Sequence, residues 1–240
     1  MMQLKIDNIY KSYNKKFVVN GISLYINQGE IVGLLGPNGA GKTTTFYSII
    51  GMISPNSGNI YLDDLNITKY PMYKRAQLGI SYLAQEPSIF RKLTVEQNIM
   101  AIIEFLDISK NEKKEKLYGL LEELNLTHLR KRLAYSLSGG EKRRVEIARA
   151  LVNTPKFVLF DEPFVGIDPI AVDDIQKIAF DLKSRGFGIL ITDHNVRETL
   201  EIIDRAYIVS KGQLLLEGTA IDLINNEEAR RVYLGEKFNM

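Results

Sequence analysis

The stretch GPNGAGKT, Gly36 to Thr43, constrains this chain more than any other feature of its sequence. It fits the pattern G-x-x-x-x-G-K-[ST], whose glycine-rich backbone can surround phosphate groups. The apolar run EIVGLL precedes it and KTTTFYSII follows it, which predicts a buried strand, a loop and a helix. In such a loop the amides of residues 39–43 cradle phosphates, Lys42 reaches the β- and γ-phosphates, and the Thr43 hydroxyl binds Mg²⁺. We therefore predict a nucleoside triphosphate site formed by Gly36, Pro37, Asn38, Gly39, Ala40, Gly41, Lys42, Thr43 and Thr44.

A second motif can supply the chemistry that a phosphate loop lacks. KFVLFDEP reads as an apolar strand that ends in Asp161 and Glu162. Taken alone, two acids after a strand are as typical of an ordinary polar turn. Beside a phosphate loop, at the carboxyl end of a strand where open α/β sheets bind ligands, they have a specific interpretation. Asp161 supports Mg²⁺ through a water molecule, and Glu162 polarises the attacking water.

Two further polar residues follow predicted buried strands. His194 lies in ILITDHN and is one of only two histidines, and Gln85 lies in SYLAQEP. A lone histidine after a strand is more often structural, and a lone glutamine there is unremarkable. Together with the two motifs above, we predict that His194 contacts the γ-phosphate or the attacking water. Gln85 is predicted to contact both Mg²⁺ and that water.

The stretch SLSGGEKRRVEIARA, residues 136–150, allows two interpretations that are compatible with each other. Ser138 and Glu141 have the spacing of a capping box, in which each side chain accepts a backbone hydrogen bond at a helix start. The same helix start has free N–H groups and the positive end of the helix dipole, so it also attracts phosphate. Gly139 and Gly140 would let a ligand approach the backbone closely.

The chain divides into stretches of different character. LKIDNIY and FVVNGISLYI alternate in polarity and predict an antiparallel sheet near the N-terminus. Residues 94–135 have helical spacing and no convincing strand, whereas the later apolar runs KFVLF, FGILIT and AYIVS alternate with helical segments and predict a largely parallel sheet. We expect a single α/β domain of the P-loop NTPase (RecA-like) type. Residues 1–90 and 151–240 would form the nucleotide-binding core with its antiparallel β part, and residues 91–150 an inserted α-helical subdomain.

Composition narrows the functional classes. Thirty-one basic and 29 acidic residues give a net charge of +2, which argues against a dedicated nucleic-acid binder. The absence of cysteine excludes disulfides, thiol catalysis and thiolate metal sites. No apolar run approaches the ~18 residues that cross a bilayer, and the first residues lack the core of a signal peptide. We expect a cytosolic chain that reaches a membrane only through a partner.

GPNGAGKTT, Gln85, LSGGE, FVLFDEP, Asp168 in GID, and His194 together resemble the ABC-type ATPases in order and spacing, over essentially the whole chain. The resemblance implies a homodimer that hydrolyses ATP with Mg²⁺. In it, the turn of Ser138, Gly139, Gly140 and Glu141 in one subunit closes over the nucleotide held by the other, and Asp168 couples the two subunits. Tyr13 matches the aromatic residue that stacks on adenine, although packing is an alternative role for it. Ala84 departs from the family, because many members have proline before the glutamine.

Segments outside these motifs indicate a subfamily. SIFRKLTVEQN, DEPFVGIDPIAV, LITDHNVRETL, RAYIVSKG and the tail RRVYLGEKF resemble the ATPase subunits of bacterial lipopolysaccharide exporters. That resemblance implies two transmembrane partner subunits and a place on the cytoplasmic face of the inner membrane. ATPase subunits of branched-chain amino-acid importers share the framework and the YLG tail and are the alternative. Nucleic-acid-associated ABC ATPases usually add long coiled coils or a second ATPase domain, for which 240 residues leave no room.

Phe90 and Arg91 lie in EPSIFRKL, between Gln85 and the helical segment. A large aromatic residue there could anchor the helical insert to the core. The alternative, which the family resemblance favours, is that Phe90 and Arg91 line a groove where a short helix of the membrane subunit docks. We expect the second role for both residues.

Overall fold

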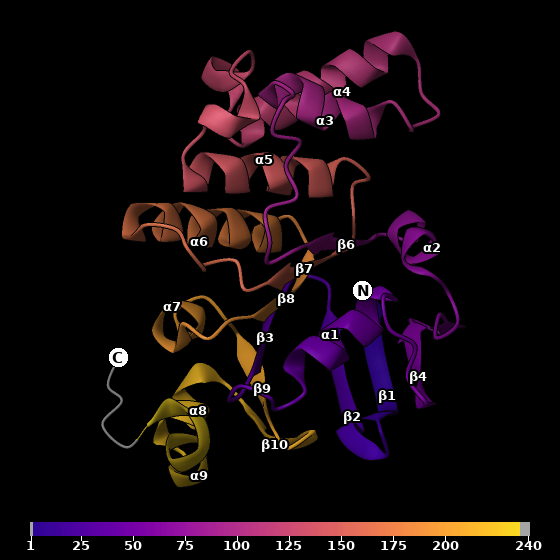
Figure 1. Ribbon diagram of the computed structural model, residues 1–240, viewed down its shortest axis with the longest axis vertical. Helices are drawn as coiled ribbons and strands as arrows, with labels where there is room; N and C mark the ends of the chain where they lie inside the picture. The colour runs from indigo at the N-terminus through magenta and orange to yellow at the C-terminus, as the bar shows by residue number, and fades with distance from the viewer. Residues whose placement is uncertain (1, 236–240) are drawn as a thin grey trace.

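Two β-sheets organise this computed structural model, which describes residues 2–235 (Figure 1). The last three residues of the tail RRVYLGEKF therefore lie outside the described residues. The first sheet is antiparallel, with the order β2-β1-β4-β5. Its strands are β1 Gln3–Tyr13, β2 Lys16–Asn27, β4 Ser57–Leu62 and β5 Leu65–Asn66. The predicted antiparallel sheet near the N-terminus is confirmed, and β4 and β5 extend it beyond the two strands that the sequence indicated.

The second sheet has the order β10-β9-β3-β8-β7-β6, and its strands are parallel apart from the antiparallel edge strand β10. The strands are β3 Ile31–Leu35, β6 Ile80–Leu83, β7 Phe157–Asp161, β8 Gly188–Thr192, β9 Arg205–Ser210 and β10 Gln213–Gly218. Since β3, β6, β7 and β8 run in one direction, their carboxyl ends meet at one edge of the sheet. The segments that carry the predicted site begin at that edge, except for Tyr13, which ends β1 of the first sheet.

Alternation along the strands builds two hydrophobic cores, one on each face of the second sheet. In β7, Val158 and Phe160 pack into the core shared with the helices, whereas Phe157 and Leu159 pack into the core shared with the antiparallel sheet. Successive side chains of a strand point to opposite faces, so both faces of a covered sheet must be apolar. This is why the central strands read as continuous apolar runs.

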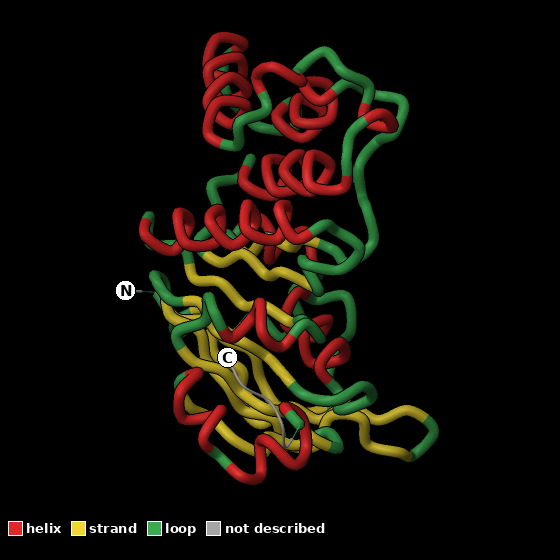
Figure 2. Tube along the Cα trace, turned by 90° about the vertical axis from the view of Figure 1, so that its left-hand side faces the viewer, coloured by secondary structure: helices red, strands yellow, loops and turns green. Residues whose placement is uncertain are grey.

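The segment between β6 and β7 is helical. It contains α3 Val95–Ile103, α4 Lys110–Glu123, short 3₁₀ turns at Thr127–Leu129 and Ala134–Ser136, and α5 Gly139–Leu151. Capping boxes begin all three α-helices, at Thr94, Ser109 and Ser138. These helices gather at one end of the molecule, with α6 Pro169–Ser184 between α5 and the sheet (Figures 1 and 2). The subdomain boundaries at residues 91 and 150 stay a prediction.

The remaining helices lie around the second sheet. They are α1 Lys42–Ile50, α2 Met72–Gln77, α7 Val196–Leu200, α8 Ala220–Asn225, α9 Glu227–Ala229 and a π-helical turn, η3, Arg230–Leu234. The buried side chains of Leu223, Ala229 and Leu234 join the core that also contains the helical insert. The C-terminal segment is therefore packed onto the fold as far as it is described.

Candidate functional site

The loop from Gly36 to Gly41 joins β3 to α1, and its first and last glycines are sterically required. Gly36 has φ +144°, and a Cβ atom there would lie 2.1 Å from the carbonyl oxygen of Val209. Gly41 has φ +105°, and its Cβ atom would lie 2.4 Å from the carbonyl oxygen of Val18. Such distances exclude any side chain unless the backbone moves. The predicted pattern thus fixes the path of this loop between strands of both sheets.

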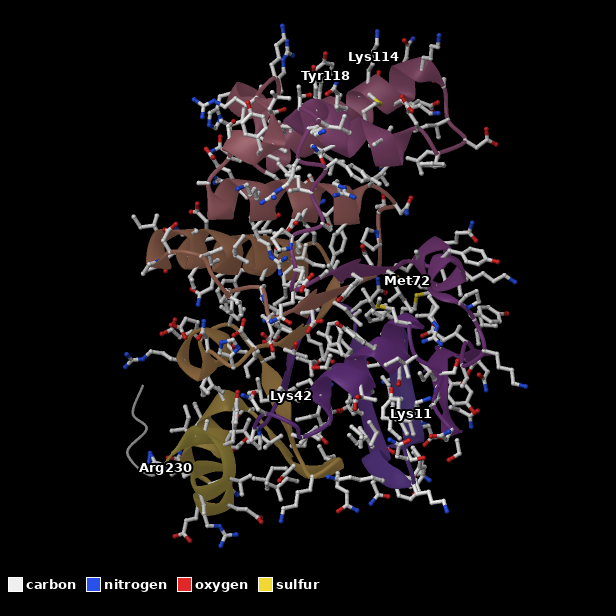
Figure 3. All side chains as sticks on the ribbon, in the orientation of Figure 1. Lys11, Lys42, Met72, Lys114, Tyr118 and Arg230 are labelled. Carbon is white, nitrogen blue, oxygen red and sulfur yellow. The ribbon has the colours of Figure 1, made fainter. Side chains whose placement is uncertain are left out.

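The start of α1 suits an anion. Gly41 is its N-cap, no side chain within residues 2–235 caps it, and its first turn contains no acidic residue. The Lys42 ammonium donates to the backbone carbonyls of Gly36 at 2.7 Å and Pro37 at 3.1 Å, so the side chain folds back over the loop (Figure 3). Burial lowers the pKa of Lys42, and the nearby carboxylates of Glu162 and Asp193 oppose that shift. A cation, the N–H groups of the first helical turn and the helix dipole therefore converge on one position.

Asp161 ends β7 and is 2% exposed. Its Oδ1 accepts from the Thr192 hydroxyl at 3.0 Å and its Oδ2 accepts from the Tyr82 hydroxyl at 3.1 Å. Burial raises the pKa of Asp161, and these two hydrogen bonds act in the opposite direction. The carboxylate is thus oriented by strands on both sides of β7.

Glu162 follows at φ +45°, a left-handed conformation that is uncommon outside glycine. Its N–H donates to the Thr192 carbonyl at 2.7 Å, which holds this turn against β8. Its Oε2 accepts from the Gln85 amide at 2.7 Å and lies 3.3 Å from His194 Nδ1. The structure therefore brings the predicted Gln85, Glu162 and His194 together at one carboxylate oxygen, Oε2 of Glu162. The strained backbone of Glu162 is of the kind that is found at functional sites.

Asp193, which the sequence analysis did not single out, supports this cluster from behind. It is fully buried, and its carboxylate accepts from the backbone N–H groups of Phe164 at 3.1 Å and Asn195 at 2.8 Å. Burial raises its pKa, whereas those two hydrogen bonds lower it. The segment that follows β8 is thereby tied to the segment that follows β7.

A buried ion pair connects the site to α5. Arg143 and Glu146 lie 3.1 Å apart, with side chains 6% and 3% exposed. The Arg143 guanidinium also donates to the Ala84 carbonyl at 2.6 Å and the Asp161 carbonyl at 3.4 Å, while Glu146 accepts from the Ser88 N–H at 2.6 Å. Residues just before and just after Gln85 are therefore anchored to the helix that begins at Ser138.

The predicted capping box at Ser138 is confirmed. The Ser138 hydroxyl accepts from the Glu141 N–H at 3.2 Å, and the Glu141 carboxylate accepts from the Ser138 N–H at 2.7 Å. Ser138 and Gly139 are exposed, whereas Gly140 is buried against Ala171, where a Cβ atom would lie 2.7 Å from the alanine methyl group. Asp168, also exposed, caps α6 by accepting from the Ala171 N–H at 3.0 Å. Both helix starts thus lie at the surface of the protein.

Tyr13 and Phe90 are placed differently from the central cluster. Tyr13 ends β1 and is 47% exposed. The Lys11 ammonium lies over its ring, 5.5 Å from the ring centroid. The Phe90 ring is 46% exposed, and the Arg149 guanidinium lies 4.5 Å from its centroid. The backbone of Phe90 is anchored instead, by two hydrogen bonds with the buried side chain of Asn98 at 2.8 and 3.1 Å. Arg91, next in the chain, is exposed.

The sequence analysis therefore missed five side chains that position the site, namely Tyr82, Arg143, Glu146, Thr192 and Asp193. Asp193 had a usable signal, because it ends an apolar strand as Asp161 does. Tyr82 and Thr192 had none, because they contact Asp161 from other strands. Arg143 and Glu146 have the spacing of an ordinary helical ion pair, and nothing in the sequence indicates that the pair is buried or that it also holds Ala84 and Ser88. As a whole the arrangement can bind a phosphate chain, present a carboxylate to a water molecule and hold an imidazole beside that carboxylate.

Known proteins share this sequence and fold. The profile of the ABC transporter family matches residues 19–165. The lipopolysaccharide export system ATP-binding protein LptB of Haemophilus influenzae is 54% identical over 241 residues, covering all of both chains. LptB of Escherichia coli K12 is 52% identical with the same coverage. An uncharacterised ABC transporter ATP-binding protein of Rhizobium meliloti is 56% identical over 96% of this chain and 85% of its own.

Solved structures agree in fold. The ADP conformation of an ATP-binding cassette from an ABC transporter superposes with a TM-score of 0.88 at 30% identity, covering 98% of this chain and all of its own. A nucleotide-free cassette of an ABC transporter gives a TM-score of 0.87 at 29% identity with the same coverage. The predicted P-loop NTPase fold with an antiparallel β part is confirmed. From its sequence and from its fold, this chain belongs to the ABC transporter family, as one of its ATPase cassettes.

Proposed function

We propose that this cassette powers the export of lipopolysaccharide from the inner membrane, as a homodimer bound to two transmembrane subunits. The observation that carries the proposal is the identity of 52–54% over the full length of lipopolysaccharide export ATP-binding proteins. This similarity favours export over the alternative of branched-chain amino-acid import. Within residues 2–235, no helix is long and apolar enough to span a bilayer. We place the chain at the cytoplasmic face of the membrane, held there by its partner subunits.

In the proposed reaction Lys42 and the loop amides hold the triphosphate of ATP, and Glu162 takes a proton from the attacking water. His194, 3.3 Å from the Glu162 carboxylate, orients that water or the γ-phosphate. The oxygen donors of Thr43, Gln85 and Asp161 suit Mg²⁺, which prefers oxygen ligands. When bound, Mg²⁺ would neutralise the charge that develops on the phosphates. Tyr13, exposed at the end of β1, is proposed to stack on adenine.

A second copy of the chain would complete each site. The turn of Ser138, Gly139, Gly140 and Glu141 starts a helix of 13 residues and is exposed at its first two positions. Its positive end points outward, so it can close over a nucleotide held by another subunit. Asp168 belongs to the segment that lies beside this turn. A Cβ atom at Gly139 would be 3.5 Å from the side chain of Ile167 and 3.7 Å from the carbonyl oxygen of Gly166. We propose that Asp168 transmits closure between the two sites.

The region around Phe90 is proposed to receive the membrane subunits. Because Asn98 holds the backbone there, the half-exposed Phe90 ring is not required to anchor the insert. The ring lies over Arg149, whose guanidinium also donates to the Ser88 carbonyl at 2.6 Å. Arg91 is exposed beside it. An aromatic ring backed by arginine is typical of residues that dominate binding at protein interfaces.

The experiment that tests the proposal combines capture with complementation. The chain is tagged and purified from gently solubilised membranes of its own bacterium, and the membrane proteins that accompany it are identified by mass spectrometry. In parallel the gene is depleted and the distribution of lipopolysaccharide between inner and outer membrane is measured. We expect transmembrane subunits of an exporter in the capture, and retention of lipopolysaccharide in the inner membrane that the wild-type gene reverses and Glu162→Gln does not. Capture of amino-acid importer subunits with normal lipopolysaccharide transport would contradict the proposal.

A further inference from the structure

In the C-terminal turn η3, the side chain of Tyr233 reaches the catalytic cluster. Its hydroxyl donates to the backbone carbonyl of Asp193 at 3.2 Å, across 40 residues of sequence. The backbone of Gly36 and the carboxylates of Asp193 and Glu162 also face this hydroxyl. Tyr233 therefore stands where the segments that follow β3, β7 and β8 converge.

The rest of the C-terminal segment stands away from the phosphate loop. A cavity of about 550 Å³ is lined by residues 37–40 of that loop, by residues around the turn between β9 and β10, and by Glu228, Arg231 and Val232. Leu234 and Ala229, on either side of Tyr233, are buried in the main core. The buried side chains of Ala229 and Leu234 thus hold the backbone of η3 in place, and the Tyr233 side chain extends from it to Asp193. π-Helical turns of this kind occur often at functional positions.

The carbonyl that Tyr233 contacts belongs to the peptide unit joining Asp193 to His194. The atoms of a peptide unit lie in one plane, so a hydrogen bond that holds the Asp193 oxygen also holds the nitrogen and the Cα atom of His194 in place. The Asp193 side chain is already held by the N–H groups of Phe164 and Asn195. The Tyr233 hydroxyl adds the constraint on the main chain that those two contacts lack.

The hydroxyl is also kept in its donor form. Burial, followed by the nearby Asp193 carboxylate, raises the pKa of Tyr233. A tyrosine hydroxyl is already protonated at neutral pH, and the raised pKa extends that range to more alkaline pH, so the hydroxyl can donate to the carbonyl.

We propose that Tyr233 is a positioning residue for His194: it sets the peptide before the histidine, and so places the imidazole beside the Glu162 carboxylate. The catalytic consequence rests on the role proposed above for His194, but the geometric consequence does not. If the proposal holds, the C-terminal segment influences hydrolysis without touching ATP.

The test uses Tyr233→Phe, which removes the hydroxyl and keeps the ring that packs on the core. The matched control is Tyr73→Phe, which removes the same atom from an exposed side chain on α2. Both are made in the full chain. The two histidines allow a direct readout, because in a His128→Gln background the imidazole signals in a ¹H–¹³C NMR spectrum arise from His194 alone.

We expect the His194 signals to move in Tyr233→Phe and to stay in place in Tyr73→Phe, with melting temperatures close to wild type. The kcat for ATP should fall roughly three- to tenfold with little change in KM, because removal of the hydroxyl also removes its neutral contacts with the backbone of Asp193 and of Gly36. Unchanged His194 signals would overturn the proposal, whether or not kcat falls. If the signals move while neither Tyr233→Phe nor His194→Ala affects kcat, the positioning is supported and the catalytic role of His194 fails.

Discussion

Replacing Arg143 with methionine should destabilise the protein far more than loss of an ordinary ion pair. Methionine has a similar length, but it leaves the Glu146 carboxylate buried, with a side chain 3% exposed, and without its cation. The Ala84 carbonyl also loses the donor that lies 2.6 Å away. Breaking a buried pair on one side costs about 3–5 kcal/mol. For a chain of this size, we expect the melting temperature to fall by about 6–20 °C.

A second substitution separates charge from packing. Glu146→Gln removes the negative charge and retains an oxygen that can accept from the Ser88 N–H. Arg143→Met/Glu146→Gln should therefore recover about 2 kcal/mol relative to Arg143→Met, since no uncompensated charge stays buried. Its ATPase activity should stay low, because nothing then holds the Ala84 carbonyl, adjacent to Gln85.

The assay is equilibrium unfolding in urea followed by circular dichroism, with ATPase rates measured on the same samples. Arg130→Met is the control, because Arg130 and Glu96 lie 4.0 Å apart with side chains 38% and 33% exposed. That change should cost no more than about 1 kcal/mol. A cost below about 1 kcal/mol for Arg143→Met, or a double variant no more stable than it, would refute this reasoning.

Three further predictions concern single side chains of the site and its surroundings. Lys42→Ala should weaken ATP binding and abolish turnover, since the loop loses its buried cation; calorimetric titration checks the binding, and wild-type affinity would contradict the assignment. Asp161→Asn should stabilise the nucleotide-free protein at neutral pH, because burial raises the pKa of this carboxyl and so penalises its charged form. Since the folded wild type takes up that proton at a higher pH than the unfolded chain, the advantage of Asp161→Asn should shrink as pH falls from neutral through the raised pKa. Melting temperatures across that range test this, and an advantage that grows towards low pH would oppose it. Phe90→Ala should leave the melting temperature and the ATPase rate of the isolated protein near wild type. Its affinity for the membrane subunits, measured by co-purification, should fall by about 2 kcal/mol of binding free energy. A large loss of melting temperature would instead show that the ring anchors the insert.

The parts of this fold that could be predicted from sequence are those specified by contiguous residues. The loop around Lys42 carries its glycines at fixed spacing, and the capping box at Ser138 needs only four consecutive positions. Continuous apolar runs such as the one that forms β7, Phe157–Asp161, are equally clear in the sequence. The strand β5 and the helix α2, of 2 and 6 residues, are too short to show a period.

The missed contacts depend on packing between distant segments. Tyr82 lies 79 residues from Asp161, and nothing in SYLAQ indicates that its hydroxyl faces a carboxylate. Arg143 looked like one more charge on a helical face, yet the fold buries it. Tyr233 could be read from the sequence only as part of a tail. Long-range partners of this kind become visible only when the strands and helices are assembled.

The central claim is that Glu162 drives hydrolysis of an ATP molecule enclosed between two copies of this chain. Glu162→Gln keeps the size of the side chain and removes its basic carboxylate, so ATP should bind and remain uncleaved. Light scattering with saturating ATP and Mg²⁺ measures the mass in solution directly. The account predicts a persistent dimer of Glu162→Gln, twice the 27.3 kDa of one chain, that returns to monomer when ATP is removed. A monomer under saturating ATP, or wild-type turnover by this variant, would contradict it.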